Sequence, residues 1–557
     1  MYSFENFKIW KISAGTSFFN QDAVKKMLAE GYVSMADDTP ALATSTKTQW
    51  NEFKEASVGD ICYLCHGNNG VKAIGFFVAE VEEFNGKWKK RNVQWLYYST
   101  NPTMAYSGER KWWTPNSNST FCVVQKNERP LFENLILTPF FQKTLAELKK
   151  SWTTKFKEVQ EMIDYTSLLK NKKNIILQGA PGTGKTYKTS ELALSIIDAL
   201  PTRTAGEDDK SFHKKVMDVY DKKAIKLNKD GSFVDPNAQI GFVTFHQSMD
   251  YEDFVEGIKP EIVENVNHEK NVIYDYSKGI FKSLVRRAET AFSDALNNFK
   301  QTMNGQIIKT ITGVDITINI SGNDKISIVN SNSESYDISD NDLKKDDDEL
   351  RNNRAYYQLA VKKALNVKKY VLIIDEINRG NVSKIFGELI SLLEADKRAG
   401  GDHPLSVILP YSKESFSVPS NLYIIGTMNT TDRSIGSIDY AVRRRFAFVT
   451  LEADESKAPV GDARELFKAV RHFLKESKYD MDIEDLMVGH SYFMDATNLQ
   501  MKWQYEILPL LMEYHKDGII SKSPLKNDSG NEIADVKKDY AKFVEAWQKK
   551  ESDSPNP

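Results

Sequence analysis

Short runs of apolar residues recur between residues 171 and 455, and polar segments typical of loops and helices separate them. Continuous apolar runs of this length are typical of strands that lie buried in a parallel sheet. The expected strands are residues 175–177, 242–245, 371–374, 422–425 and 446–451. The pattern therefore predicts an α/β core with a parallel sheet over residues 171–455.

The segments on either side of this core, and two stretches within it, have different patterns. Apolar residues at near-helical spacing predict a helical connector over residues 146–170 and a helical lid over residues 456–550. Residues 201–240 are polar and rich in lysine and aspartate, and residues 300–350 join a β-like run at 307–329 to a polar tract. We expect both stretches to be solvated insertions into the core.

The first 145 residues alternate short β-like runs with turns, and a helical stretch at 21–30 follows the first run. An Asn-Gly turn joins the runs at 61–65 and 73–81, which is a strong hairpin signal. This pattern predicts a separate domain of mixed α+β structure over residues 1–145. Six of the nine tryptophans of the chain lie in it.

Composition narrows the class of protein. Hydrophobic residues make up 41% of the chain and charged residues 27%, as in a globular protein. No apolar run is long enough to span a membrane, the N-terminus lacks a signal-peptide pattern, and three cysteines fit a reducing compartment. We therefore expect a cytoplasmic protein without membrane contact. The net charge of −3 means that any contact with DNA depends on a local basic patch.

One cysteine pattern has two readings. Cys62, Cys65 and His66 match the spacing of a c-type haem attachment site. Haem attachment of this kind requires export, for which the sequence gives no support. A buried strand followed by a turn explains the same residues, and we favour that interpretation.

A complete Walker A motif follows the first core strand and leads into a helical pattern, which is the context that this motif requires. Its glycines allow backbone N–H groups to turn toward phosphate oxygens. The expected phosphate-binding residues are Gly179, Ala180, Pro181, Gly182, Thr183, Gly184, Lys185 and Thr186. Lys185 is expected to reach the β- and γ-phosphates, and the Thr186 hydroxyl to bind Mg²⁺.

Two further core strands end in polar residues. The strand at 371–374 ends in Asp375, the expected partner of Mg²⁺, and Glu376, the expected general base for the attacking water. The strand at 422–425 leads to Asn429, which we expect between the other two motifs in a parallel sheet, where it orients the water. Together with the Walker A motif, these residues predict nucleotide hydrolysis.

Three consecutive arginines, Arg443, Arg444 and Arg445, come just before the last core strand. They suit a solvated helix end, but they also suit arginine fingers that reach the γ-phosphate held by a neighbouring subunit. Arginine supplied in this way stabilises the charge of the transition state. Because the other three motifs are present, we favour the finger interpretation.

Several of these segments resemble the McrB family of AAA+ proteins. The segment 428–434, Met-Asn-Thr-Thr-Asp-Arg-Ser, resembles the family signature MNTxDRS, and 374–380 resembles its Walker B stretch. Residues 244–257 resemble its second-strand region, and 489–493 resemble a string in its C-terminal lid. The resemblance covers roughly residues 165–520.

The resemblance implies a hexameric AAA+ ring that recognises modified DNA, uses GTP with Mg²⁺, and drives a separate McrC-like nuclease subunit. It also implies that Asp432 and Arg433 organise the site. The chain has no Asn-Lys-x-Asp motif for reading guanine. The assignment of GTP as the substrate therefore rests on the resemblance, and ATP is the alternative nucleotide. A MoxR-type ATPase that remodels protein partners, and a motor for RNA-directed defence, are the alternative functions.

The first 145 residues also resemble a PUA-like domain of the EVE or YTH type, on the strings at 9–12, 31–35, 58–61 and 75–78. Such domains hold a modified base between aromatic side chains, and stacking of this kind contributes about 1–3 kcal/mol per base. A tryptophan in a small β-rich domain is, however, more often part of the core. The pocket candidates are Trp10, Tyr32, Trp95, Trp112 and Trp113.

Overall fold

The computed structural model describes residues 4–42, 47–67, 70–204, 206–228, 233–264, 270–310, 313–322, 324–344, 355–431, 438–479 and 481–547. The chain forms two compact units. Unit 1 contains Met1–Tyr165 and Leu200–Val219, and unit 2 contains Thr166–Ala199 and Tyr220–Pro557. Within the described ranges no helix is long and apolar enough to cross a membrane.

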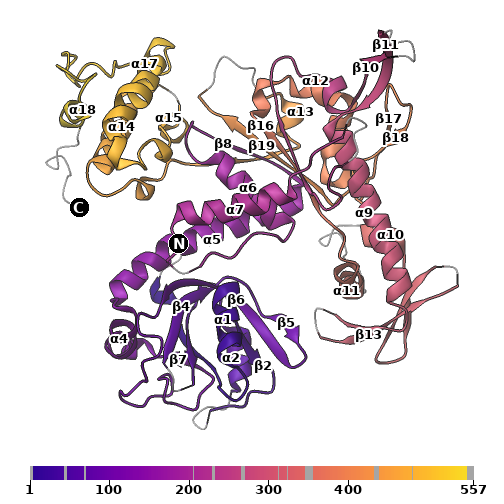
Figure 1. Ribbon diagram of the computed structural model, residues 1–557, viewed down its shortest axis with the longest axis vertical. Helices are drawn as coiled ribbons and strands as arrows, with labels where there is room; N and C mark the ends of the chain where they lie inside the picture. The colour runs from indigo at the N-terminus through magenta and orange to yellow at the C-terminus, as the bar shows by residue number, and fades with distance from the viewer. Residues whose placement is uncertain are drawn as a thin grey trace. The chain divides into compact units, whose positions relative to one another are not determined.

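Unit 1 is built on a seven-stranded sheet in the order β2-β6-β4-β3-β1-β7, with β5 paired to β6 (Figure 1). Strands β1 and β3 run parallel, and the other pairs are antiparallel. The strands are β1 (Ile9–Ala14), β2 (Tyr32–Ala36), β3 (Ile61–His66), β4 (Val71–Phe77), β5 (Glu82–Asn85), β6 (Trp88–Tyr98) and β7 (Phe121–Val124). The expected mixed fold of the N-terminal region is confirmed.

Successive side chains of a strand point to opposite faces of the sheet, and in this sheet the sets of side chains on both faces are apolar. Helices therefore cover both faces. One set packs on α1 (Gln21–Glu30) and α2 (Gln49–Glu55). The other packs on α3 (Arg129–Phe132), α4 (Thr138–Phe141) and the start of α5 (Leu145–Lys172). Cys62 and Cys65 belong to opposite sets and are buried free thiols, which agrees with the strand interpretation.

Unit 2 contains a five-stranded sheet in the order β20-β8-β19-β16-β9, and all its pairs are parallel. Its strands are β8 (Asn174–Gly179), β9 (Ile240–Thr244), β16 (Tyr370–Asp375), β19 (Leu422–Asn429) and β20 (Ala447–Thr450). Helices of the core include α6 (Lys185–Ile196), α8 (Tyr251–Phe254), α9 (Ile280–Thr302), α12 (Val382–Phe386) and α13 (Tyr440–Arg443). The predicted parallel sheet is confirmed, and β19 lies between β8 and β16 as expected.

Two hairpins extend from this core. Strands β10 (Glu256–Glu264) and β11 (Lys270–Lys278) form one of them, and β17 (Val407–Ile408) and β18 (Ser415–Phe416) form the other. The buried carboxylate of Glu256 links them. It accepts hydrogen bonds from Lys282 Nζ (2.6 Å) and from the backbone N–H of Tyr411 (3.0 Å).

The stretch expected as a solvated insertion at 300–350 contains an antiparallel sheet of four strands, with a hydrophobic cluster of its own. The strands are β12 (Ile307–Lys309), β13 (Asp315–Ile320), β14 (Ile326–Asn330) and β15 (Ser335–Ile338). Isoleucines at alternate positions of β13 and β14 face Phe299 of α9 and Val361 of α11 (Ala355–Leu365). The short helix α10 (Asp340–Lys344) follows the sheet. The other stretch, 201–240, contains α7 (Asp209–Lys223), whose first part belongs to unit 1.

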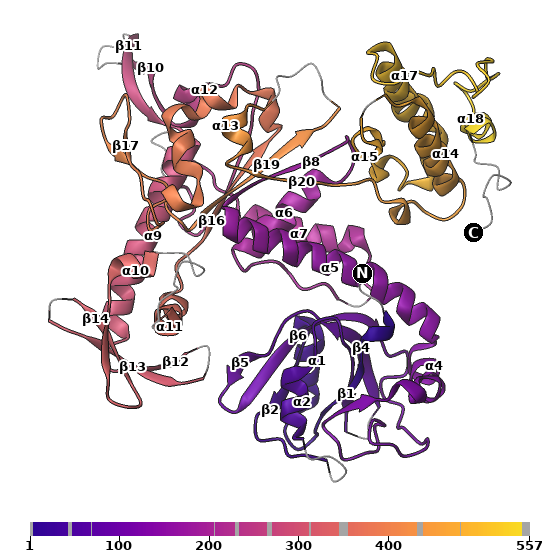
Figure 2. The ribbon, with the colours of Figure 1, turned by 180° about the vertical axis from the view of Figure 1, so that it is seen from behind.

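The C-terminal part of unit 2 is helical, as expected (Figure 2). Its helices are α14 (Asp462–Ser477), α15 (Ile483–Leu486), α16 (Leu499–Lys502), α17 (Leu508–Lys516) and α18 (Tyr540–Trp547). They share one hydrophobic cluster, in which Phe473, Trp503 and Trp547 are fully buried. We call this part the lid.

Candidate nucleotide-binding site

The loop between β8 and α6 has the geometry of a phosphate cradle. β8 ends at Gly179 and α6 begins at Lys185. Gly182 and Gly184 have φ angles of +80° and +83°, a conformation that glycine adopts without strain. The N-terminus of α6 follows directly, so backbone N–H groups and the positive end of the helix dipole act at the same place.

Lys185 lies inside this loop. Its Nζ donates hydrogen bonds to the carbonyl oxygens of Gly179 (3.0 Å) and Ala180 (2.8 Å). Burial lowers the pKa of Lys185 to about 8, and the nearby carboxylates of Glu376 and Asp375 oppose this shift. Near pH 8 the ammonium and the neutral amine of Lys185 are therefore about equally populated.

We expect this lowered pKa to make nucleotide binding depend on pH. Bound phosphates favour the ammonium form of Lys185, so binding takes up a proton when the pH exceeds about 8. Nucleotide affinity should therefore fall as the pH rises from about 8 to 10, by at most about tenfold per pH unit. Calorimetric titrations in buffers of different ionisation enthalpy measure this proton uptake. An affinity independent of pH in this window would contradict the assignment.

Asp375 is the last residue of β16, and a buried threonine on the neighbouring strand orients it. Thr427 Oγ1 donates a hydrogen bond to Asp375 Oδ1 at 2.6 Å and accepts one from the backbone N–H of Glu376 at 3.1 Å. Thr427 therefore fixes both acidic residues at the end of β16. Thr427 was not among the residues expected at the site, although a hydroxyl in an otherwise apolar strand is a signal for such a role.

Glu376 is held by two donors. Asn429 Nδ2 donates to its Oε1 at 2.7 Å, and Arg379 Nε lies 3.2 Å from its Oε2. Its φ of +51° is unusual for a residue with a side chain and is a form of strain often found at functional sites. The structure thus brings Glu376 and Asn429 together. Arg379 was missed, although its place three residues after Glu376 was visible in the sequence.

The order of the strands explains why these groups meet. Asn429 at the end of β19 pairs in register with Gly179 of β8 on one side, while β16 with Asp375 lies on the other side. The carboxyl ends of parallel strands share one edge of the sheet, where ligands of open α/β sheets bind. The phosphate cradle, both carboxylates and Asn429 therefore lie at that edge.

The three consecutive arginines have different environments. Arg445 is buried, forms an ion pair with Glu394 (3.0 Å) and donates to the carbonyl oxygen of Ala441 (2.7 Å). Arg443 and Arg444 are exposed at the end of α13. The Arg443 guanidinium lies 5.2 Å from the ring centre of Phe448. Of the three consecutive arginines, only Arg443 and Arg444 therefore present a guanidinium at the surface.

The signature segment at 428–434 is described up to Thr431. The backbone N–H of Thr430 donates to the carbonyl oxygen of Gly179 (3.2 Å), and its hydroxyl donates to the backbone of Asp485 in the lid (3.0 Å). Asp432 and Arg433, to which the sequence analysis gives organising roles, lie outside the described residues.

Two family models match the chain. The alpha-helical lid domain of McrB matches residues 464–521, and the AAA domain of the dynein-related subfamily matches residues 334–446. The type IV methyl-directed restriction enzyme EcoKMcrB subunit of Escherichia coli (strain K12) is 29% identical over 372 residues. These residues cover 62% of this chain and 54% of that protein. The chain is a P-loop NTPase with an AAA domain, and its lid and core are similar to those of McrB.

A second relative of this chain is the type II restriction enzyme BsuMI component YdiS of Bacillus subtilis (strain 168). It is 34% identical over 100 residues, which cover 16% of this chain and 29% of that protein. The chain thus spans about half the length of the first relative and less than a third of the second.

In the N-terminal domain, the five aromatic pocket candidates do not form one cage. Trp10, Tyr32 and Trp95 are buried in the cluster on one face of the sheet, and Trp113 is buried in the cluster on the other face. The Trp10 indole donates to Asp60 (2.8 Å), and that of Trp113 donates to Glu128 (2.8 Å), as in core tryptophans. Trp112 is 41% exposed.

Exposed aromatic rings do lie near Tyr32, at the β5–β6 hairpin. The ring of Phe84, which is 43% exposed, lies 5.3 Å from that of Tyr32, and Lys90 Nζ lies 6.0 Å from the Tyr32 ring. Phe18 is exposed beside Trp88, with ring centres 5.7 Å apart. Rings and a cation in this arrangement suit stacking of a base and contact with phosphate.

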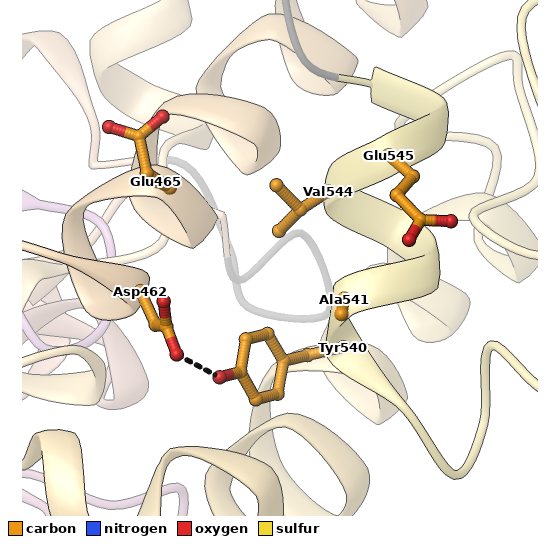
Figure 3. Close-up of a pocket in the computed structure, with 6 residues that line it drawn as sticks. All are labelled: Asp462, Glu465, Tyr540, Ala541, Val544 and Glu545. Atoms are coloured by element: carbon orange, nitrogen blue, oxygen red, sulfur yellow. Dashed lines mark hydrogen bonds between the residues drawn. The ribbon is translucent and has the colours of Figure 1, made fainter.

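A cavity of about 160 Å³ lies in the lid, between α14 and α18 (Figure 3). Its lining combines an apolar floor with carboxylates, and Tyr540 donates a hydrogen bond to Asp462 (2.7 Å). Lys468 and Lys542 pair with the other two carboxylates, Glu465 and Glu545. The cavity contains none of the residues of the phosphate cradle, so it plays no part in the chemistry described above.

Proposed function

We propose that this McrB-family chain is the nucleotide-hydrolysing motor subunit of a modification-dependent DNA restriction system. The observation that carries the hydrolysis is the arrangement of Glu376, which Asn429 and Arg379 hold beside Asp375 and the phosphate cradle. The restriction role is supported by the two relatives, whose names describe a methyl-directed restriction enzyme subunit and a restriction enzyme component.

In this proposal the loop from Gly179 to Lys185 binds the phosphates, with Lys185 leaving the loop carbonyls for the β- and γ-phosphates. Thr186 and Asp375 hold Mg²⁺, which neutralises charge on the phosphates when bound. Glu376 takes a proton from the water that Asn429 orients. The water oxygen forms a bond to the γ-phosphorus, and the bond to the bridging oxygen breaks, which gives a nucleoside diphosphate and phosphate.

We further propose that GTP is the preferred nucleotide, that the active form is a hexameric ring, and that a separate McrC-like nuclease subunit cuts the DNA. These three points rest on the family resemblance. The ring is also supported by the exposure of Arg443 and Arg444, since exposed arginines are available to a neighbouring subunit. We also propose that the β5–β6 hairpin of the N-terminal domain binds the modified base. The exposed rings of Phe84 and Phe18 and the nearby ammonium of Lys90 support this proposal.

The experiment uses the purified full-length chain with Mg²⁺. We expect hydrolysis to be faster with GTP than with ATP. We also expect tighter binding to a duplex that carries methylated bases than to the same duplex without them, at equal salt because phosphate contacts depend strongly on salt. Phosphate release and fluorescence anisotropy of labelled DNA measure the two quantities.

Each part of the proposal has its own contrary result. A clear preference for ATP would contradict the assignment of GTP. Equal affinity for both duplexes would contradict the reading of modified DNA, and it would favour the alternative of a MoxR-type ATPase that remodels proteins. Replacing Phe84 by alanine should reduce the preference for the modified duplex, whereas alanine at the buried Trp113 should act through stability instead.

A further inference from the structure

The arginine segment, residues 443–445, is anchored at both of its ends. The helix α13 that leads into it has only four residues, too few to hold a helical conformation alone, so its place depends on other segments. At its start, the carboxylate of Asp439 caps α13 and accepts a hydrogen bond from Ser383 of α12. At its end, Arg445 leads toward β20 and is held through both its side chain and its backbone.

A buried asparagine holds the backbone of Arg445. Asn174, the first residue of β8, is fully buried, and its Nδ2 donates to the carbonyl oxygens of Arg445 (3.0 Å) and Leu393 (2.7 Å). Its Oδ1 accepts a hydrogen bond from the guanidinium of Arg398 at 2.7 Å. Because a guanidinium can only donate, the oxygen of the amide must face Arg398, and its N–H groups must face the two carbonyls.

Arg398 is the second buried member of this network. Its guanidinium also donates to the carbonyl oxygens of Leu393 (3.3 Å) and Pro419 (3.3 Å), just before β19. Glu394, next to Leu393, pairs with the side chain of Arg445. Buried networks of this kind favour one arrangement, because the loss of one member leaves its partners unpaired in the interior. The network thus ties the starts of β8 and β19 to the end of the arginine segment.

The place of Asn174 on β8 separates it from the nucleotide. β8 begins at Asn174 and ends at Gly179, where the phosphate cradle starts. At the usual rise of a strand these ends are about 17 Å apart, so Asn174 lies beyond contact with a bound phosphate. One strand therefore carries the cradle of its own subunit at one end and holds the arginine segment at the other.

We propose that Asn174 is a positioning residue, which holds the end of the arginine segment so that Arg443 and Arg444 reach the nucleotide of a neighbouring subunit. This inference rests on the proposed action of these arginines between subunits. Loss of the bond to Arg445 should therefore impair hydrolysis in the neighbouring subunit and leave nucleotide binding in its own subunit intact.

The substitution Asn174→Asp removes the bond to Arg445. Aspartate has the shape of asparagine and still accepts from Arg398, in a hydrogen bond that is then charge-assisted. It has no N–H to donate, so its oxygen faces and repels the carbonyl oxygens of Leu393 and Arg445. A misplacement of about 1 Å costs up to about 100-fold in rate, so we expect kcat to fall by about 10- to 100-fold. Nucleotide affinity should stay close to that of the unchanged chain.

A matched control lies at the start of the neighbouring strand. Asn421, the residue before β19, donates to the carbonyl oxygens of Ala288 (3.0 Å) and Lys368 (2.9 Å), and neither belongs to the arginine segment. Asn421→Asp makes the same chemical change, and its kcat should stay near that of the unchanged chain. Asn174→Ala repeats the test without a new charge, and thermal unfolding verifies that the variants are folded.

Mixing full-length chains distinguishes misplaced arginines from a damaged cradle. The Glu376→Gln chain lacks the base and keeps its arginines, so it supplies correctly placed arginines to an adjacent Asn174→Asp chain. Phosphate release in this mixture should recover toward the rate of the unchanged chain. A mixture of Asn174→Asp with the Arg443→Ala/Arg444→Ala chain should show no recovery, because neither chain supplies effective arginines. A defect in the cradle on β8 would not be relieved by a neighbour.

The contrary results are distinct. An unchanged kcat in Asn174→Asp, or a loss that mixing with Glu376→Gln does not relieve, would overturn the role of Asn174. An equal loss in Asn421→Asp would show a general effect of the strand starts and would overturn it too. If Glu376→Gln does not relieve even the Arg443→Ala/Arg444→Ala chain, the proposed action between subunits fails, and the role of Asn174 fails with it.

Discussion

Replacing Glu376 by glutamine is expected to slow nucleotide hydrolysis by about 10²- to 10⁴-fold, the usual contribution of a general base. Glutamine has the shape of glutamate, and its amide oxygen can still accept the hydrogen bond from Asn429. It cannot take up the proton of the attacking water. Nucleotide affinity should change little, because Lys185 and the loop of β8 and α6 are untouched.

The measurement compares phosphate release in a single turnover with the affinity for a fluorescent nucleotide. A matched control is Glu161→Gln at a half-exposed position of α5, where the ion pair with the exposed Lys157 (3.8 Å) contributes little. The control should behave like the unchanged chain in both assays. If Glu376→Gln lost nucleotide binding together with hydrolysis, its assignment as the base would be wrong.

Alanine at both Arg443 and Arg444 is expected to lower kcat by about 10³- to 10⁵-fold, the range known for arginine fingers. Both side chains are exposed at the end of α13 and suit a role at the site of a neighbouring subunit. The nucleotide site of the same subunit keeps its cradle and Glu376, so nucleotide affinity should fall much less than kcat. Hydrolysis rates at saturating nucleotide measure the effect.

A mixing experiment tests whether the arginines act between subunits. In a mixture of the Arg443→Ala/Arg444→Ala chain with the Glu376→Gln chain, some interfaces combine an intact base with intact arginines. Hydrolysis should then rise well above that of either variant alone. A mixture that stays inactive would contradict action between subunits. Arg445→Ala is the comparison, because loss of its buried pair with Glu394 should lower the unfolding temperature.

Local sequence determined the main parts of the nucleotide site. Each part is a short apolar run followed by glycines, acids or an amide, and such runs become buried parallel strands. Once the strands are parallel, their carboxyl ends must share an edge, so Lys185, Asp375, Glu376 and Asn429 were expected together. Sheet pairing bears out this expectation for the strands that carry them.

The hydrogen-bond partners of the site residues depend on contacts between segments that are distant in the sequence. Thr427 bridges Asp375 and Glu376 only because β19 pairs with β16 in one register. The same holds for the lid, whose turn at Gly489 reaches the loop at Pro181 across most of the core sequence. No periodicity in the sequence encodes which distant backbone groups will meet.

Adjacent residues of the same type differ in burial, and the sequence alone does not predict which one is buried. Arg443, Arg444 and Arg445 are identical neighbours, yet only Arg445 is taken into the core, where Glu394 and a backbone carbonyl compensate its charge. In the same way, Trp112 is exposed and Trp113 is buried although they are adjacent. At a turn or a helix end, the side chains of successive residues point in different directions. The packing around them decides which side chain is buried.

The sequence by itself determined the parts of the proposed nucleotide site: a phosphate loop, two acids and an amide at the ends of parallel strands. Only the tertiary structure decided which side chains hold Glu376, which arginines stay at the surface, and which turn of the lid contacts the cradle. The physical reason is that strand and loop types follow from neighbours along the chain. Partners, burial and exposure follow from contacts between segments that are distant in the sequence.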